Sequence, residues 1–193
     1  GVIKKVVDGE ISSIFKNLYV ERKVEQELFK TIQSEKIDIV HYESFYTALY
    51  INERIKELGV KQIFGTENIE YLNYQDYAQR LAPTLLKPFY LFEAKKIRQE
   101  EEELLKKADI SLAVTQTEGD VIKNITGKEC YVVENGVDLN YFAYRKRKVN
   151  KQKNILFVGN FSYFPNLSGI KHFYYNVFKK LPDENVRLII VGK

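Results

Sequence analysis

The stretch CYVVENGVDLNYF, residues 130–142, joins an apolar run to a polar segment and two aromatic residues. Its first four residues predict a buried strand, and Asn135-Gly136 is a dipeptide that commonly ends a strand in a turn. A second apolar run, NILFVGNFSYFPN, follows at residues 154–166 and also ends at a glycine and polar residues. Strands with such endings indicate an α/β protein whose binding residues lie at the strand ends.

Apolar runs and helical patterns alternate along the rest of the chain. The runs are continuous in Val and Ile, which predicts parallel strands covered by helices on both faces. Thr115 and Thr117 are candidate helix N-caps, and Gly59 is placed to end a helix. The predicted strands are 36–40, 60–64, 109–114, 130–133, 154–158 and 186–191. The predicted helices are 20–35, 48–58, 71–80, 85–107, 167–180 and one that starts at these threonine caps and continues through 121–125.

Composition limits the class of protein. The 193 residues, 45% of them hydrophobic, are enough for one or two domains with a core. A net charge of +4 is too small to indicate nucleic-acid binding, and one cysteine without a membrane-length apolar run predicts a soluble cytoplasmic protein. Two distant histidines and one cysteine have no metal-ligand spacing, so we predict no metal site. No GxGxxG or GxxxxGK[ST] loop is present to indicate a dinucleotide or kinase-type site.

The segment YRKRKVNKQKN, residues 144–154, is polar and basic and lies between two predicted strands. We predict that it is a solvated interdomain linker, because a basic run of this kind is more often a linker than a nucleic-acid arm. The predicted division is a first domain over residues 1–143, the linker, and the first βαβ unit of a second domain over residues 155–193.

Each polar residue near a strand end also has a purely structural explanation. Glu67 and Glu70 lie three apart at a helix start, where carboxylates stabilise the helix dipole. His41 after a strand is more often a hydrogen-bonded structural residue, and Gly159 could serve only the close approach of a helix. The run Glu100–Glu103 predicts a solvated helix face with ion pairs four residues apart.

Four stretches of the chain resemble segments of the family 4 glycosyltransferases, and they follow one another along the chain in the same order as in that family. ENGVDLNYF resembles the N-G-V-D-x-x-x-F segment that closes the N-terminal domain in that family. LLKKADISLAVTQTEGDVI is similar to the segment before it, and FGTENIEYLNYQDYA to an upstream HNIE…Y segment. ILFVGNFSYFPNLSGIKHFYYNVFKKL is similar to the opening of the second domain in transferases of cell-surface polysaccharide synthesis. The resemblance covers roughly residues 36–193.

The resemblance implies the GT-B architecture, in which two Rossmann-like parallel sheets with flanking helices face each other across a cleft. It implies a retaining glycosyltransferase that moves a sugar from a UDP- or GDP-linked donor to a cell-surface polysaccharide or lipid-linked acceptor. No cofactor or metal is implied, since amide dipoles and basic side chains stabilise the leaving diphosphate. The family's Glu-x7-Glu segment would lie beyond Lys193 and its glycine-rich loop before Gly1. We therefore expect a fragment, truncated at both ends and inactive alone.

The resemblance also gives roles to individual residues. Glu67 and His41 are the catalytic candidates, although relatives have His where this chain has Glu67. Many relatives place Arg and Lys where this chain has Asn160 and Asn166. The candidates for donor and diphosphate binding are Gly159, Asn160, Phe161 and Asn166, those for the interdomain cleft are Asn135, Gly136 and Asp138, and those for the acceptor side are Asn68, Glu70 and Tyr74.

In relatives, the region that matches the aromatic-rich stretch Tyr71–Tyr90 faces the acceptor. Together with the positive net charge, this predicts peripheral association with an anionic membrane, at its inner face, and no nucleic-acid partner. Two other functions stay open. One is a sugar-nucleotide epimerase on the same scaffold, which needs acidic and His residues converging on the nucleotide sugar. The other is a non-catalytic binding or scaffold protein that lacks the Glu-x7-Glu segment.

Overall fold

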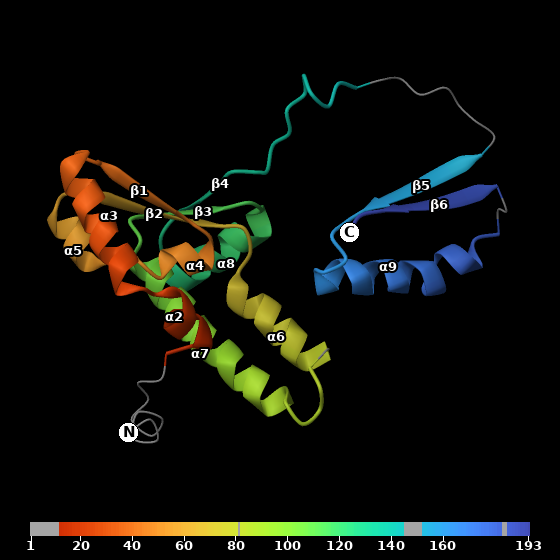
Figure 1. Ribbon diagram of the computed structural model, residues 1–193, viewed down its shortest axis with the longest axis horizontal. Helices are drawn as coiled ribbons and strands as arrows, with labels where there is room; N and C mark the ends of the chain where they lie inside the picture. Colours follow the sequence, from red (N-terminus) through yellow and green to blue (C-terminus); the bar gives the residue numbers. More distant parts are fainter. Residues whose placement is uncertain (1–11, 81, 145–151, 183–184) are drawn as a thin grey trace. The chain divides into compact units, whose positions relative to one another are not determined.

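The computed structural model of the chain describes residues 12–80, 82–144, 152–182 and 185–193 (Figure 1). Within each sheet, helices lie between successive parallel strands, which confirms the expected Rossmann-like α/β class. A parallel pair needs a crossover between its strands, and helices supply it here.

The chain divides into two compact units, residues 1–136 and residues 137–193. Each unit has its own parallel sheet, of four strands in the first and two in the second. The expected linker, residues 144–154, belongs to the second unit in this division, and its residues 145–151 lie outside the described part of the chain.

The first unit is built on a parallel sheet with strand order β1-β2-β3-β4. Its strands are β1 (Ile39–Glu43), β2 (Lys61–Thr66), β3 (Ile110–Ala113) and β4 (Cys130–Val132). Its helices are α2 (Ile14–Tyr19), α3 (Arg22–Ser34), α4 (Ser44–Ala48), α5 (Glu53–Glu57), α6 (Glu70–Arg80), α7 (Lys87–Lys107) and α8 (Gln116–Thr126).

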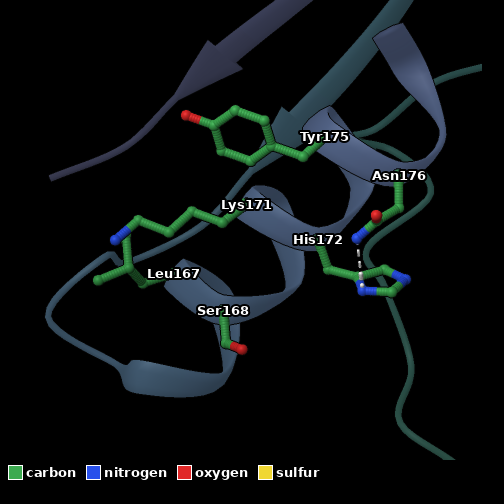
Figure 2. A pocket seen from close by; sticks show the side chains of 6 residues that line it. All are labelled: Leu167, Ser168, Lys171, His172, Tyr175 and Asn176. Carbon is green, nitrogen blue, oxygen red and sulfur yellow. Dashed lines mark hydrogen bonds between the residues drawn. The ribbon is translucent and has the colours of Figure 1, made fainter. Parts of the chain in front are cut away.

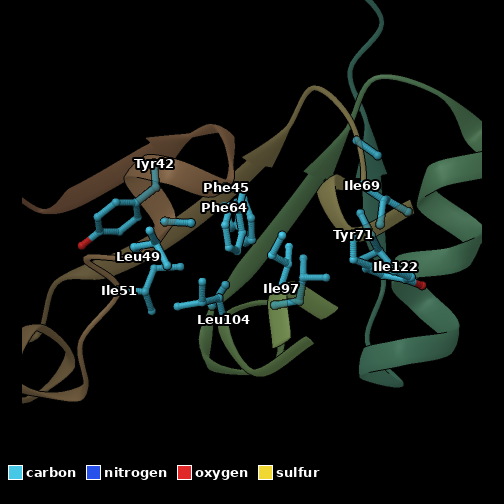
Figure 3. Packing of buried hydrophobic residues seen from close by; sticks show 14 residues of the cluster. Tyr42, Phe45, Leu49, Ile51, Phe64, Ile69, Tyr71, Ile97, Leu104 and Ile122 are labelled. Carbon is cyan, nitrogen blue, oxygen red and sulfur yellow. The ribbon is translucent and has the colours of Figure 1, made fainter. Parts of the chain in front are cut away.

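Burial in this sheet is one-sided among the described residues. Tyr42, Phe64 and Ala113 share one face and are buried against side chains of α4, α7 and α8 (Figure 3). On the opposite face Ile39 and Tyr131 are more than half exposed. The expectation that helices cover both faces is therefore wrong for this part of the chain. Continuous apolar runs show that both faces are apolar, and they do not show what packs against each face.

Strand β1 begins three residues later than the predicted strand, 36–40. Lys36 has a φ of +51°, a conformation that reverses the chain just after α3 and delays its entry into the sheet. As a result His41 and Glu43 lie inside the strand and not after it.

Only the later part of the predicted helix 48–58 is helical, as α5, and α4 ends at Ala48, where the prediction begins. The cause is Gln62 of β2, which is fully buried. Its Oε1 accepts hydrogen bonds from the Asn52 N–H and the Tyr42 hydroxyl, and its Nε2 donates to the Asn52 carbonyl, each at 3.0 Å. The Asn52 side chain then caps α5 by accepting from the Arg54 N–H at 3.0 Å.

Helix α8 confirms one of the two predicted caps. The Thr115 hydroxyl accepts from the Glu118 N–H at 3.3 Å, and the helix begins at the next residue, whereas Thr117 lies inside it. Gly127, with a φ of +69°, ends the helix in the left-handed conformation that glycine adopts without strain. The predicted helix, capped by a threonine and continuing through residues 121–125, therefore corresponds to α8.

The second unit is a single βαβ element whose strands pair in parallel, with Leu156 opposite Ile189. Ile170 is buried in this unit, whereas Leu156 and Val158 are largely exposed. The predicted helix 167–180 begins earlier, because Pro165 occupies its first turn, where its missing N–H is not needed. The elements are β5 (Lys153–Val158), α9 (Phe164–Asn176), the 3₁₀ turn η1 (Phe178–Lys180) and β6 (Val186–Val191).

The acidic run on α7 is solvated only in part. Glu102 pairs with Arg98, Nε to Oε1, at 2.7 Å, and Glu103 pairs with Lys107, as the four-residue spacing predicts. Glu101, directly before Glu102, is fully buried, so the prediction of a solvated face is wrong for this residue.

Glu101 holds the start of helix α6. Its two carboxylate oxygens accept hydrogen bonds from the N–H groups of Glu70, at 2.9 Å, and Tyr71, at 3.0 Å. These N–H groups belong to the first turn of α6, where no carbonyl of the same helix can reach them. Burial raises the pKa of the Glu101 carboxyl to about 7, and the two N–H donors oppose that shift.

Two further carboxylates of α7 hold the start of α2. Glu93 accepts from the Ile14 N–H at 2.9 Å and pairs with Lys96. Glu100 accepts from the Ser13 N–H at 2.8 Å and from the Ser13 hydroxyl. Helix α7 therefore anchors the first turns of two other helices.

Candidate functional site

The predicted site residues fall into separate groups, and each unit is described by itself. One group lies at or near the carboxyl ends of β1 and β2, in the first unit, and another at the carboxyl end of β5, in the second. Carboxyl ends of parallel strands are the usual ligand sites of such sheets. The expected cleft between the two domains therefore remains a prediction.

His41 and Glu43 form a pair on the exposed face of β1. His41 Nε2 lies 3.1 Å from Glu43 Oε2. Gly65 of β2, opposite Glu43, makes room for this pair, since a Cβ at Gly65 would lie 2.6 Å from His41 Nε2. The sequence made His41 a candidate and not Glu43. Two residues at a spacing of two in one strand share a face, which is the signal that could have found the pair.

Glu67 and Asn68 lie in the exposed bend between β2 and α6. Among the described residues, no hydrogen bond or ion pair joins Glu67 to His41, the other catalytic candidate, whose ion-pair partner is Glu43. The two catalytic candidates are therefore not joined by a polar interaction in the described part of the chain.

Glu70 and Tyr74, both predicted on the acceptor side, belong to one aromatic cluster. The Tyr46 hydroxyl donates to Glu70 Oε1 at 2.8 Å. The Phe15 ring lies 5.5 Å from that of Tyr46 and 5.0 Å from that of Tyr74, and the Tyr19 ring lies 5.0 Å from Tyr46. Burial raises the pKa of the Glu70 carboxyl and that of the Tyr46 hydroxyl, and it raises the pKa of Tyr74 to about 12. Sequence reasoning missed Tyr46, an aromatic residue just after a strand end.

The residues predicted for the cleft form a different turn from the one expected. Asn135 and Gly136 belong to no helix, strand or turn, and Gly136 does not have the positive φ that a turn there would need. The turn comes later, because Asp138 Oδ1 accepts from the N–H groups of Asn140, at 2.8 Å, and Tyr141, at 3.2 Å. An Asp side chain that bonds the backbone two residues on fixes such a turn.

The β5–α9 turn brings the predicted donor-binding residues together. Asn160 Oδ1 accepts from the Ser162 N–H at 2.9 Å, and Asn166 Nδ2 donates to the Asn160 carbonyl at 3.1 Å. These bonds fix the turn before α9 begins. In the described part of the chain Asn160 Nδ2 has no hydrogen-bond partner, so it stays available as a donor.

The same turn is packed against the end of β6. The Phe161 N–H donates to the Lys193 carbonyl at 2.7 Å, and the Gly159 N–H donates to the Val191 carbonyl at 3.0 Å. A Cβ at Gly192 would overlap the Gly159 carbonyl oxygen, so only glycine allows these backbones to approach so closely.

A hollow of about 460 Å³ runs along helix α9 (Figure 2). His172 and Asn176 lie together on one side of it, with His172 Nδ1 3.2 Å from Asn176 Nδ2. No residue predicted for donor binding lines this hollow, and the sequence did not indicate it. Its lining residues are Leu167, Ser168, Lys171, His172, Tyr175 and Asn176.

A search of the described residues for three or more His, Cys, Asp or Glu side chains that could hold a metal ion finds no such group. Within the same residues no helix combines the length and the apolar character needed to span a bilayer.

No family model matches this chain, and comparison with curated proteins finds no significant match.

Proposed function

We propose that the protein carrying this chain is a retaining glycosyltransferase of the GT-B type. It would transfer a sugar from a UDP- or GDP-linked donor to a polysaccharide or lipid-linked acceptor. The observation that carries the proposal is the β5–α9 turn, where residues of the glycosyltransferase-like motif hold one another at a strand end. Two further arrangements in the first unit support it.

The turn suits a donor diphosphate in two respects. It follows the carboxyl end of a parallel strand and precedes a helix, where oriented amide dipoles favour an anion. Its shape is fixed by its own hydrogen bonds, so little reorganisation is needed when a ligand binds. Asn160 Nδ2 would supply a neutral donor where many members of the resembled family use a cation.

The aromatic cluster of the first unit suits an acceptor sugar. Aromatic side chains offer flat apolar faces, and the Glu70 carboxylate, held by Tyr46, can accept hydrogen bonds from hydroxyl groups. Glu67 and His41 stay the catalytic candidates. We add that Glu43 positions the His41 imidazole, because it occupies one ring nitrogen and leaves the other for the substrate.

The test uses the full-length protein that carries this chain, with thermal unfolding followed in the presence of UDP, GDP, ADP or no nucleotide. A ligand that binds only the folded state raises the midpoint. We expect one of UDP and GDP to raise it and ADP to leave it unchanged. The double variant Asn160→Ala, Asn166→Ala should lose that shift. Asn124→Ala, an exposed asparagine of α8 in the first unit, is the matched control and should keep it.

Two outcomes would overturn the proposal. The first is the absence of any shift at millimolar nucleotide, which would favour the scaffold function. The second is conversion of the donor sugar to another free nucleotide sugar when no acceptor is added, which would favour the epimerase.

A further inference from the structure

Helices α6 and α7 form a hairpin (Figure 1). Its far end carries exposed apolar side chains. Leu85, in the connecting turn, is 94% exposed, and Leu86, Phe89 and Phe92 are each about half exposed. We call these four residues the hairpin tip. Phe89 and Phe92 are three residues apart, which places them on one side of the start of α7.

The hairpin tip is well formed, so its exposure is not the result of a frayed end. The N–H groups of Leu86 and Lys87 donate to the Pro83 carbonyl at 2.8 and 3.0 Å. The rings of Tyr77 and Tyr90 meet edge to face, 5.1 Å apart, and tie the two helices together behind the tip. Four large apolar side chains therefore stand in a fixed arrangement that the described fold does not bury.

Positive charge predominates around the hairpin tip. Residues 77–92 contain no Asp or Glu, and they contain Lys87 and Arg80, of which Arg80 pairs with Asp76. Lys87 Nζ donates to the Gln79 carbonyl at 2.8 Å, which holds this cation at the tip. Lys95, one turn beyond Phe92, is exposed as well.

We propose that the hairpin tip is the surface by which the protein docks on an anionic lipid bilayer. Exposed apolar and aromatic side chains next to exposed lysines are typical of elements that lie in the head-group region. The apolar groups enter the acyl boundary, and the cations are attracted by anionic head groups. A second copy of the chain is a less suitable partner. A two-fold dimer through the hairpin tip would place the lysines of one copy against those of the other.

This docking goes beyond the proposed function and does not depend on it. Vesicle binding is measured without nucleotide or acceptor, so the docking proposal and the glycosyltransferase proposal can fail separately.

The experiment is co-flotation of the chain with phosphatidylcholine vesicles, with and without phosphatidylglycerol, at low and high salt. We expect binding to the anionic vesicles at low salt and its reduction at high salt. The double variant Leu85→Ser, Phe89→Ser should bind at least about tenfold more weakly, since both apolar groups would otherwise leave water. Lys87→Gln should weaken binding about fivefold, the effect of one cation near the surface.

The matched control is Leu139→Ser, Phe142→Ser, which removes one Leu and one Phe that are also exposed, in the turn after Asp138. It should bind as the unchanged chain does. Circular dichroism of each variant reports that it is folded. Equal binding to neutral and anionic vesicles at low salt would overturn the proposal, and so would equal losses in the control and the tip variant. A dimer in solution that Leu85→Ser, Phe89→Ser abolishes would also overturn it, in favour of a second copy.

Discussion

The two halves of helix α7 differ in what their apolar residues contact. From Glu93 onward, Ile97 and Leu105 are fully buried, and Glu101 holds the first turn of another helix. Before Glu93, Phe89 and Phe92 are about half exposed, although this half is the more aromatic. Aromatic content alone therefore does not show which half stabilises the fold. Contacts to the sheet identify that half.

The comparison separates two kinds of contribution. Residues of the buried half should affect the free energy of unfolding, because they fill the core or satisfy buried N–H groups. Residues of the hairpin tip should leave that free energy unchanged and should affect only binding to an external surface. Four substitutions or conditions test this separation.

The largest effect is expected for Leu105→Ala, in the buried half. Leu105 is fully buried in the core, so its truncation should lower the free energy of unfolding by about 3 kcal/mol. Urea denaturation of the chain measures this change. Leu91→Ala, a partly exposed leucine of the other half, is the matched control and should change it by less than about 1 kcal/mol. Similar losses in both variants would show that the two halves do not differ.

The next largest effect is expected for Glu101→Ala at slightly acidic pH. It removes the hydrogen-bond partner of two buried N–H groups, and we expect a loss of about 2 kcal/mol. Its neighbour Glu102 supplies the control, because its ion pair with Arg98 lies at the surface and should contribute less than about 1 kcal/mol. Urea denaturation measures both losses. If Glu102→Ala and Glu101→Ala lower the free energy of unfolding equally, Glu101 does not anchor α6.

Glu101 also shows what the sequence could have predicted. Its position is four residues after Ile97 and four before Leu105, so the helical period places it on the apolar face of α7. The run of four glutamates hides this, because it looks like a uniformly solvated stretch. Periodicity does mark the residue as buried. Which N–H groups it satisfies could not be predicted, since α6 meets α7 only through the tertiary fold.

The same limit applies to Gln62 and to the candidate site. The kinds of element were predictable because Val and Ile runs and helix caps are local features, as Gly59 and Thr115 show. The break between α4 and α5 was not predictable from local features, because the Gln62 side chain that bonds to it comes from the next strand. In the β5–α9 turn the predicted residues are close in sequence and do meet. In the first unit the partner of His41 was missed, because the strand was placed three residues too early.

The third effect is the pH dependence of unfolding that Glu101 adds. Burial raises the pKa of its carboxyl to about 7 in the folded chain, whereas an unfolded glutamate has a pKa of about 4.3. Between these values the folded chain holds a proton that the unfolded chain has lost. The stabilisation is therefore complete below about pH 4 and is lost as the pH rises toward 7.

The measurement is the difference in unfolding free energy between the unchanged chain and Glu101→Ala, from pH 5 to pH 8.5. The difference cancels the contributions of other titrating groups that both chains share. Glu103 is one such group, because the hydrogen bond from Lys107 lowers the pKa of its carboxyl. The destabilisation by Glu101→Ala should shrink with rising pH by about 1–2 kcal/mol. A difference that stays constant over this range would show that Glu101 is ionised throughout.

The smallest effect is expected for Phe89→Ser, at the hairpin tip. About half of this side chain is already in water, and its ring meets only Tyr90 edge to face, 5.6 Å away, among the ring contacts of the described residues. Its replacement should change the free energy of unfolding by less than about 1 kcal/mol in urea denaturation. A loss near that of Leu105→Ala would mean that another part of the protein buries Phe89, and the hairpin tip would not then be a free surface. A negligible loss together with weaker vesicle binding would assign the two halves of α7 to different tasks, because folding would depend on one half and docking on the other.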